Sequence, residues 1–157
     1  PYNYNRKIVG FDTFTGFPDV SDHDINSKPG EFSVTKGYED ELGEILSLHS
    51  ENNPIPNIIK CELIKGDATV TVEKYLKEHP ETIISFAYFD FDNYEPTKVC
   101  LKLCKDHFVK GSIVGFDEVN HPDFPGETLA LKEVFGLNDI QLERIPFSPT
   151  QSFFVFI

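Results

Sequence analysis

The chain has 157 residues, of which 39% are hydrophobic and 25% are charged, and its formal net charge is −12 at pH 7. This composition predicts one soluble globular domain with its own hydrophobic core. No apolar run reaches the roughly 20 residues that a membrane span needs. The acidic charge argues against a nucleic-acid partner, because binding to phosphate needs basic patches.

Strands and helices are expected to alternate along most of the chain. Apolar runs and amphipathic stretches predict, in order, a strand over 7–11, a helix over 38–50, a strand over 58–64, a helix over 68–78, a strand over 82–91, a helix from Pro96 to about 108, a strand over 112–116 and a helix over 127–135. Such alternation predicts a mainly parallel sheet with helices on both faces. The short connection between two final strands, 140–145 and 152–157, predicts that this pair is antiparallel.

Three segments carry more specific expectations. The stretch 82–91 is apolar on both faces, as the centre of a parallel sheet should be. The loop 13–36 is longer than compact domains usually carry without a function, so it is a candidate lid or acceptor-binding segment. Cys100 and Cys104 share a helix face without a second ligand pair for zinc, which favours buried free thiols. The odd total of three cysteines fits a reducing compartment, the cytoplasm.

Every predicted parallel strand runs into acidic residues. These residues are Asp12, Asp67, Asp90 with Asp92, and Asp117 with Glu118. Ligands of open α/β sheets bind beyond the carboxyl ends of the strands, where these side chains would gather. One acid after a strand commonly caps the next helix, but four such ends in series favour a ligand site.

The first two acidic ends allow two interpretations each. Asp12 is placed to accept both hydroxyls of a ribose, or to cap the turn that follows it. Gly66, Asp67 and Ala68 would set a carboxylate and a backbone N–H against an adenine edge. Alternatively, Asp67 is the N-cap of the next helix. The residue pattern leaves both pairs of interpretations open.

The last two acidic ends suggest a cation. Alternation along a strand would put Asp90 and Asp92 on one side, where two like charges are unfavourable without a cation or donors. Asp117 and Glu118 end the neighbouring strand, so together they offer an oxygen-only site for magnesium, manganese or calcium. Asp92 itself is expected to cap the helix at Pro96. His121 is a candidate base, although a solvent-exposed loop histidine is the commoner case.

Three segments, in order, resemble the motifs of one family. They are residues 10–18 (GFDTFTGFP), 88–98 (YFDFDNYEPTK) and 110–118 (KGSIVGFDE), and 124–127 (FPGE) continues the match. They are similar to the second-, fourth- and fifth-strand motifs of the macrocin O-methyltransferase family, which modifies deoxysugars of antibiotics. The similarity covers essentially the whole chain, and it most resembles the calicheamicin rhamnosyl 3-O-methyltransferase branch.

The resemblance implies an α/β fold of class I S-adenosylmethionine-dependent methyltransferases, Rossmann-like, with a mostly parallel sheet and a C-terminal antiparallel hairpin. Residues 1–157 would form a single methyltransferase domain that is incomplete at its N-terminal side. The family's first strand and glycine-rich loop, which hold the methionine part of the cofactor, lie upstream of its second-strand motif. The chain as given would then lack a central strand and bind the cofactor poorly.

The resemblance also assigns roles to residues. It implies S-adenosylmethionine as methyl donor and a 6-deoxyhexose hydroxyl as acceptor, with help from a divalent cation, magnesium being favoured. The cofactor-binding residues would be Asp12, Phe14, Gly66, Asp67 and Ala68. The metal ligands would be Asp90, Asp117 and Glu118, with Asp90 also the base and His121 a second catalytic candidate. Many family members carry two aspartates after the fifth strand, so Glu118 is a departure that puts strict metal dependence in question.

Two other classes of function stay open. Asp90-Phe91-Asp92 resembles the acidic pair of haloacid-dehalogenase-type phosphatases, although that family places the pair on its first strand. A non-catalytic module that keeps the methyltransferase fold is the second alternative. The sequence leaves open whether the acceptor is a free sugar, a nucleotide-linked sugar or a glycoside, and whether the protein is a homo-oligomer.

Overall fold

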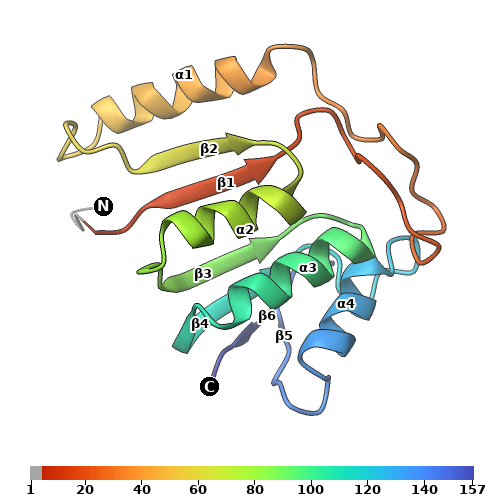
Figure 1. Cartoon of the computed structure of the whole chain (residues 1–157). Helices are drawn as coiled ribbons and strands as arrows, with labels where there is room; N and C mark the ends of the chain where they lie inside the picture. The colour runs from red at the N-terminus through yellow and green to blue at the C-terminus, as the bar shows by residue number, and fades with distance from the viewer. Residues whose placement is uncertain (1–4) are drawn as a thin grey trace.

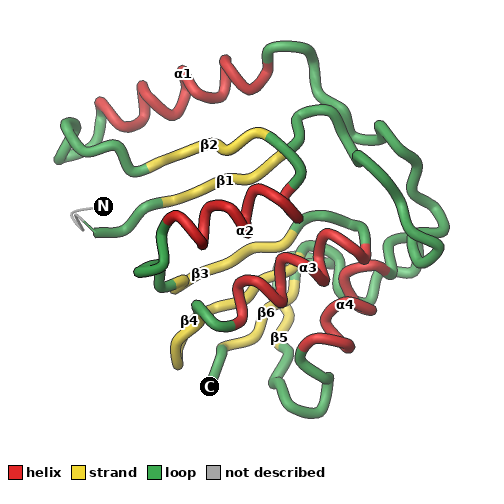
Figure 2. The backbone as a smooth tube through the Cα atoms, viewed as in Figure 1, coloured by secondary structure: helices red, strands yellow, loops and turns green. Residues whose placement is uncertain are grey.

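The computed structural model describes residues 5–157, and its elements are shown in Figures 1 and 2. The strands are β1 (Ile8–Asp12), β2 (Cys61–Lys65), β3 (Ile84–Phe89), β4 (Phe108–Phe116), β5 (Glu143–Arg144) and β6 (Ser152–Val155). The helices are α1 (Tyr38–Glu51), α2 (Ala68–Glu78), α3 (Tyr94–Lys105) and α4 (Gly126–Val134). No helix within the described residues is long and apolar enough to span a bilayer.

The strands form one parallel pair and one mixed sheet. β1 lies parallel to β2, and β3 lies parallel to β4 in a four-stranded sheet of order β3-β4-β6-β5. β6 is antiparallel to both β4 and β5, which confirms the predicted C-terminal antiparallel pair. Strands that alternate with helices and end in this hairpin confirm the predicted fold class.

The sheet is divided between β1 and β3. Within residues 5–157, β1 pairs only with β2, and β3 pairs only with β4, so each has one edge without a strand partner. The helix α2 follows β2 and lies across this division (Figure 1). The expectation from the family resemblance, that a central strand is lacking, stays a prediction.

The core lies between the four-stranded sheet and the helices α2, α3 and α4, which form one layer (Figure 2). In α3, Thr97, Cys100, Leu101 and Cys104 recur at helical spacing and are buried against this sheet. Their burial confirms the expectation of free, buried thiols. The rings of Phe89, Phe116 and Phe154 stack across β3, β4 and β6, with centroids 5.5 and 6.4 Å apart. Each such side chain contributes about 1.5–3 kcal/mol when buried.

The other face of the four-stranded sheet is open in the described residues. Phe86 is 60% exposed and Tyr88 is 41% exposed, and Ile113 and Val155 on the neighbouring strands are also exposed. Helices on both faces of this sheet, and a strand 82–91 buried on both sides, were therefore wrong predictions for this part of the chain. β3 also ends at Phe89, two residues earlier than predicted.

The start of β4 differs from the prediction as well. The strand begins at Phe108, where a helix end was expected, because α3 already stops at Lys105. The register between β3 and β4 shifts after Ile84, and the Ser112 hydroxyl bridges the irregular stretch. This hydroxyl accepts from the Val109 N–H at 2.9 Å and donates to the Ile84 carbonyl at 2.6 Å. A side-chain bridge of this kind leaves no periodic signal in the sequence.

Candidate active site

The acidic strand ends come together at one edge of the molecule. The Gly66 N–H donates to the Asp12 carbonyl at 2.9 Å, which joins the ends of β1 and β2. The Asp117 N–H donates to the Phe89 carbonyl at 3.1 Å, which joins the ends of β3 and β4. Burial, and then the charges of Asp117 and Asp12, raise the pKa of Asp90, which indicates that the ends of β1, β3 and β4 lie near one another. This is the arrangement that the sequence predicted for ligand binding.

Asp12 closes a tight turn at the end of β1. Its Oδ1 accepts from the Phe14 N–H at 2.6 Å, and Phe14 has a positive φ of 57°. The side chain is exposed, so the turn does not enclose the carboxylate. The structure therefore bears out the turn interpretation and leaves the carboxylate accessible to a ligand.

Asp67 caps α2, as one of its two interpretations predicted. Its Oδ1 accepts from the Thr69 N–H at 2.8 Å and from the Thr69 hydroxyl at 2.7 Å. Gly66 before it has a φ of 143°, and a Cβ there would lie 2.9 Å from the Thr71 methyl group. Only glycine fits this turn, which brings the backbone beside Ala68 close to the end of β1.

Asp90 carries a carboxylate with a raised pKa. Loss of hydration is the main cause, and the charges of Asp117 and then Asp12 add to it. Among residues 5–157 no hydrogen-bond donor faces this carboxylate. A carboxylate in such surroundings is a stronger base than an ordinary aspartate.

Asp92 does not lie as predicted. β3 has ended before it, and its φ of 58° breaks the strand alternation that would have put it beside Asp90. It does not cap α3 either, since the N–H of Tyr94 bonds elsewhere. Burial, followed by the charges of Glu118, Asp90 and Asp117, raises the pKa of Asp92 to about 7.

Asp117 is held by two side chains that the sequence reasoning missed. The Tyr88 hydroxyl donates to its Oδ1 at 2.5 Å, and the Gln151 amide donates to the same atom at 3.1 Å. Gln151 also donates to the Tyr88 oxygen at 2.9 Å. Burial, and then the bond to Asp117, raise the pKa of Tyr88. The only sequence signal for Tyr88 was its place in the motif 88–98.

Glu118 and His121 follow Asp117 on the loop after β4. Glu118 Oε2 is buried without a hydrogen-bond partner among the described residues, and burial raises the pKa of this side chain. His121 Nδ1 accepts from the Asp123 N–H at 3.3 Å, and its ring lies 5.5 Å from that of Phe124. The nearby His121 lowers the pKa of Glu118, so both belong to this edge.

The predicted metal ligands have the oxygen atoms that a divalent cation prefers, but their side chains do not converge on one point. Burial raises the pKa values of Asp90 and Glu118 and the charge of Asp117 adds to both, as expected of a site that a cation would stabilise. However, no group of three or more His, Cys, Asp or Glu side chains converges closely enough to hold an ion anywhere in residues 5–157. A metal at Asp90, Asp117 and Glu118 would require these side chains to move.

A third residue that the sequence reasoning missed is Glu127. It lies in the first turn of α4 and is fully buried. Its Oε1 accepts from the Phe91 N–H at 3.2 Å and its Oε2 from the Glu118 N–H at 3.0 Å. Burial raises its pKa to about 8, although the two N–H donors lower it in part. An acid in the first turn of a helix is usually exposed, so local pattern gave no sign of this burial.

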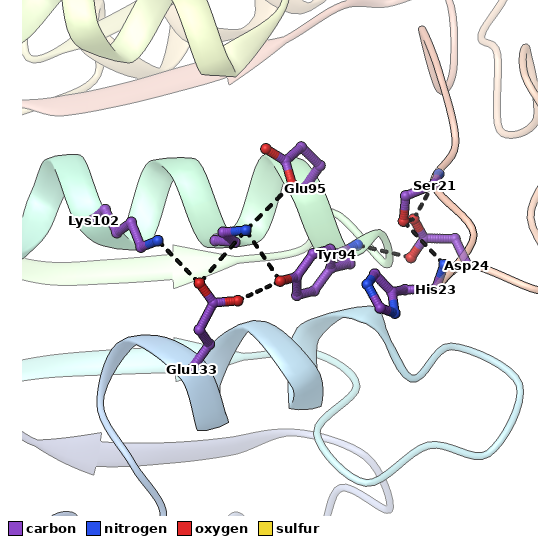
Figure 3. Close-up of polar contacts among 8 residues, drawn as sticks. Ser21, His23, Asp24, Tyr94, Glu95, Lys102 and Glu133 are labelled. Carbon is purple, nitrogen blue, oxygen red and sulfur yellow. Dashed lines mark hydrogen bonds and ion pairs between the residues drawn. The ribbon is translucent and has the colours of Figure 1, made fainter.

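The long loop 13–37 is anchored beside this site by Asp24 (Figure 3). This buried carboxylate accepts from the Tyr94 N–H at 2.8 Å and from the Ser21 N–H and hydroxyl at 3.0 and 2.5 Å. Asp24 therefore caps α3, the role that was wrongly expected of Asp92. Gly126 packs against this junction, where a Cβ would lie 2.4 Å from the Tyr94 nitrogen.

The same loop also contacts the segment after β4. The Asn26 amide donates to the Asp123 carbonyl at 3.2 Å. The ring of Phe32 lies 5.4 Å from Phe17 and 6.3 Å from Phe124. The loop thus bridges the end of β1 and the segment that carries His121, which is a suitable position for a lid.

A polar cluster joins α3 to α4 on the other side of Tyr94 (Figure 3). The Tyr94 hydroxyl donates to Glu133, and the ammonium groups of Lys102 and Lys98 lie 3.1 and 3.5 Å from the same carboxylate. The bond from Tyr94, followed by that from Lys102, lowers the pKa of Glu133 to about 2. This cluster holds α3 and α4 together, and the first turns of both helices lie beside the site.

The parallel strand pairs, the intervening helices and the C-terminal antiparallel hairpin match a class I S-adenosylmethionine-dependent methyltransferase fold. Comparison with solved structures identifies methyltransferases that are similar to this chain in sequence as well as in fold. The crystal structure of CalS11, a calicheamicin methyltransferase, matches with a TM-score of 0.94 and 43% identity, covering 99% of this chain and 62% of that one. The resemblance to antibiotic deoxysugar O-methyltransferases that the motifs predicted is thereby confirmed.

Two further solved structures match the chain at different levels of sequence identity. The apo structure of CalS11, described as a TDP-rhamnose 3'-O-methyltransferase, matches with a TM-score of 0.85 and 38% identity, over 99% of this chain and 60% of that one. The O-methyltransferase NovP matches with a TM-score of 0.71 over 96% of this chain and 60% of that one, but at 18% identity it shows the fold alone. No family model and no curated protein sequence matches the chain.

Proposed function

We propose that the protein is an S-adenosylmethionine-dependent O-methyltransferase that acts on a sugar hydroxyl. The observation that carries this proposal is the 43% identity with a calicheamicin methyltransferase over 99% of the chain. The acidic strand ends at one edge of the molecule agree with it. The chain spans 62% of the length of that relative, so the activity of the whole protein is a proposal.

The acceptor that we propose is a 6-deoxyhexose, carried on a thymidine diphosphate. One matched structure is described as a TDP-rhamnose 3'-O-methyltransferase, at 38% identity. Of the acceptors that the sequence left open, a free sugar, a nucleotide-linked sugar and a glycoside, this likeness supports proposing the nucleotide-linked sugar. TDP-rhamnose is therefore the first acceptor to test.

The end of the β1–β2 pair fits the nucleoside part of the cofactor. Asp12 presents an exposed carboxylate for the ribose hydroxyls, next to the backbone turn at Gly66. Phe14, whose N–H bonds to Asp12 in the same turn, is proposed as a further cofactor-binding residue. At Asp67 the Oδ1 is already used by the cap, so the adenine edge would meet its other oxygen or the backbone at Ala68. When bound, the cofactor supplies an electrophilic methyl group on a sulfonium.

Asp90 is the base that we assign for the acceptor hydroxyl. Its raised pKa favours proton uptake, and no donor among residues 5–157 competes for its oxygens. Tyr88 and Gln151 hold the neighbouring Asp117 in place, so that its charge stays close to Asp90. His121 is the second candidate for the proton, from the loop that contacts the lid segment. Correct positioning of the reacting groups accounts for much of the rate acceleration in an in-line methyl transfer, and these contacts provide that positioning.

A divalent cation at Asp90, Asp117 and Glu118 is a further proposal, and it requires the carboxylates to converge when the ion binds. The raised pKa values of Asp90 and Glu118 support it, and the present geometry does not. We therefore place no step of the transfer on a metal.

The test is methyl transfer from radiolabelled S-adenosylmethionine to TDP-rhamnose by the full-length protein. The wild type should label the sugar, and Asp90→Asn should not. Asp106→Asn is the matched control, because this exposed aspartate lies at the C-terminal end of α3, at the other end of the helix from the site. No labelling by the wild type contradicts the proposal, and magnesium-dependent release of phosphate would favour the phosphatase alternative.

A further inference from the structure

Glu127 joins the two segments that carry the candidate active-site carboxylates. It extends from the first turn of α4 to the chain just after β3 and just after β4. Its partner Phe91 directly follows Asp90, and its partner Glu118 directly follows Asp117. One side chain thus bonds to the backbone next to both acids, at a point where the strand pairing of β3 with β4 has already ended.

The chemistry of the contact is specific to a carboxylate. Each oxygen accepts one backbone N–H, at 3.2 Å for Phe91 and 3.0 Å for Glu118. Hydrogen bonds to a charged acceptor are about twice as strong as neutral ones. A glutamine offers one oxygen and one NH₂, so it satisfies one N–H and opposes the other.

Burying the Glu127 carboxylate costs free energy, and packing against neighbouring side chains does not offset this cost. The side chain has no exposed surface, although burying a carboxylate is unfavourable unless donors offset it. It lies among other acids, Asp90 and Asp92, which add to that cost. An apolar residue would fill the same space without this cost, but it would leave the two N–H groups unbonded.

We propose that Glu127 is a positioning residue, which fixes the spacing between Asp90 and Asp117 by binding the backbone N–H groups of Phe91 and Glu118. It does not touch the reacting atoms. It limits the relative movement of two short segments that are otherwise linked by the bond from the Asp117 N–H to the Phe89 carbonyl and by the bond from the Tyr88 hydroxyl to Asp117. The expected effect of Glu127 on catalysis rests on the proposed methyl transfer. Its expected effect on the two backbone segments does not depend on that function.

The experiment compares Glu127→Gln with Glu133→Gln in the full-length protein. Glu133 lies on the same helix, but its carboxylate faces the surface cluster with Lys98 and Lys102. Amide hydrogen exchange by NMR should become about 10- to 100-fold faster at Phe91 or at Glu118, whichever N–H the new NH₂ group opposes, in Glu127→Gln alone. The kcat for methyl transfer should fall about 10- to 100-fold, as for a displaced catalytic group. The affinity for S-adenosylhomocysteine should stay within about twofold, because Asp12 and Gly66 lie on the other strand pair.

The outcomes separate the two proposals. Unchanged exchange at Phe91 and Glu118 in Glu127→Gln would overturn the positioning role. Faster exchange with an unchanged kcat would show that the two contacts are structural only. A wild type without methyl transfer would refute the proposed function, while the exchange rates would still decide whether Glu127 fixes the two segments. If Glu127→Gln fails to fold, Glu127→Asp, which reaches one N–H at most, provides the same comparison.

Discussion

The cap of α3 by Asp24 is the contact that most directly links the long loop to the site. Replacing Asp24 with alanine removes the acceptor of the Tyr94 N–H and of the Ser21 N–H and hydroxyl. Loss of a helix cap costs about 0.5–2 kcal/mol, and leaving a buried donor unpaired costs about 1–3 kcal/mol. Because these contributions overlap, we expect a total loss of about 2–4 kcal/mol in the free energy of unfolding.

The assay is thermal unfolding of the two variants Asp24→Ala and Asp22→Ala beside the wild type. In a domain of this size about 1 kcal/mol corresponds to about 2–4 °C, so Asp24→Ala should lower the Tm by about 4–16 °C. Asp22 is exposed in the same loop and serves as the control, with little change expected. Asp24→Asn keeps an oxygen for the Tyr94 N–H and should lie between the wild type and Asp24→Ala.

A Tm of Asp24→Ala equal to that of Asp22→Ala would refute this reasoning. It would mean that α3 begins without help from the loop, or that water replaces the carboxylate at no cost. A normal Tm with a raised KM for the sugar would instead show that Asp24 orders the lid without stabilising the helix.

The other predictions concern the site itself. Asp90→Asn should abolish methyl transfer while the affinity for S-adenosylhomocysteine, measured by calorimetry, stays nearly intact; unchanged turnover would remove Asp90 as the base. Asp12→Ala should weaken that affinity about tenfold or more, as loss of a charged hydrogen-bond acceptor does. Chelation with EDTA should lower turnover, and added magnesium should restore it, if a cation draws Asp90, Asp117 and Glu118 together. Burial raises the pKa of Glu127 to about 8 and that of Asp92 to about 7, so the folded chain binds more protons than the unfolded chain between about pH 4 and 8. Stability to urea should therefore fall as the pH rises from 5 to 8, and Glu127→Gln should weaken this dependence.

Local features of the sequence were predicted well. The helix 68–78 has the predicted bounds, since Asp67 caps it and Val72 and Leu76 recur on its buried side. The C-terminal pair was correctly predicted as antiparallel, because the connection 146–151 is too short for a crossover. These elements depend on neighbours a few residues apart, and periodicity reports such neighbours directly.

Contacts between distant residues were not predicted. Asp24 and Tyr94 are 70 positions apart, and Glu127 and Phe91 are 36 positions apart. Nothing in the pattern around Asp24 distinguishes it from the exposed Asp22 two positions earlier. The resemblance marked the segments that form the site, but only the fold shows which side chain within each segment faces which partner.

The strand alternation failed for a related reason. Asp90 and Asp92 were placed on one side of a strand, but pairing with β4 stops at Phe89. Beyond the last paired residue the chain follows its own turn, and Asp92 takes a left-handed conformation. A sequence pattern gives the period of a strand but not the residue at which its partner leaves it.

The two acids at the ends of β3 and β4 differ in a way that bears on their roles. Asp117 accepts hydrogen bonds from Tyr88 and Gln151, which satisfy one of its oxygens. Asp90 has no such donor in the described residues, and it bears the repulsion of Asp117 and Asp12. Binding a proton therefore relieves repulsion at Asp90. If a cation also binds here, it would compete with the proton at Asp90, so the pH dependence of turnover should shift to lower pH when magnesium is added.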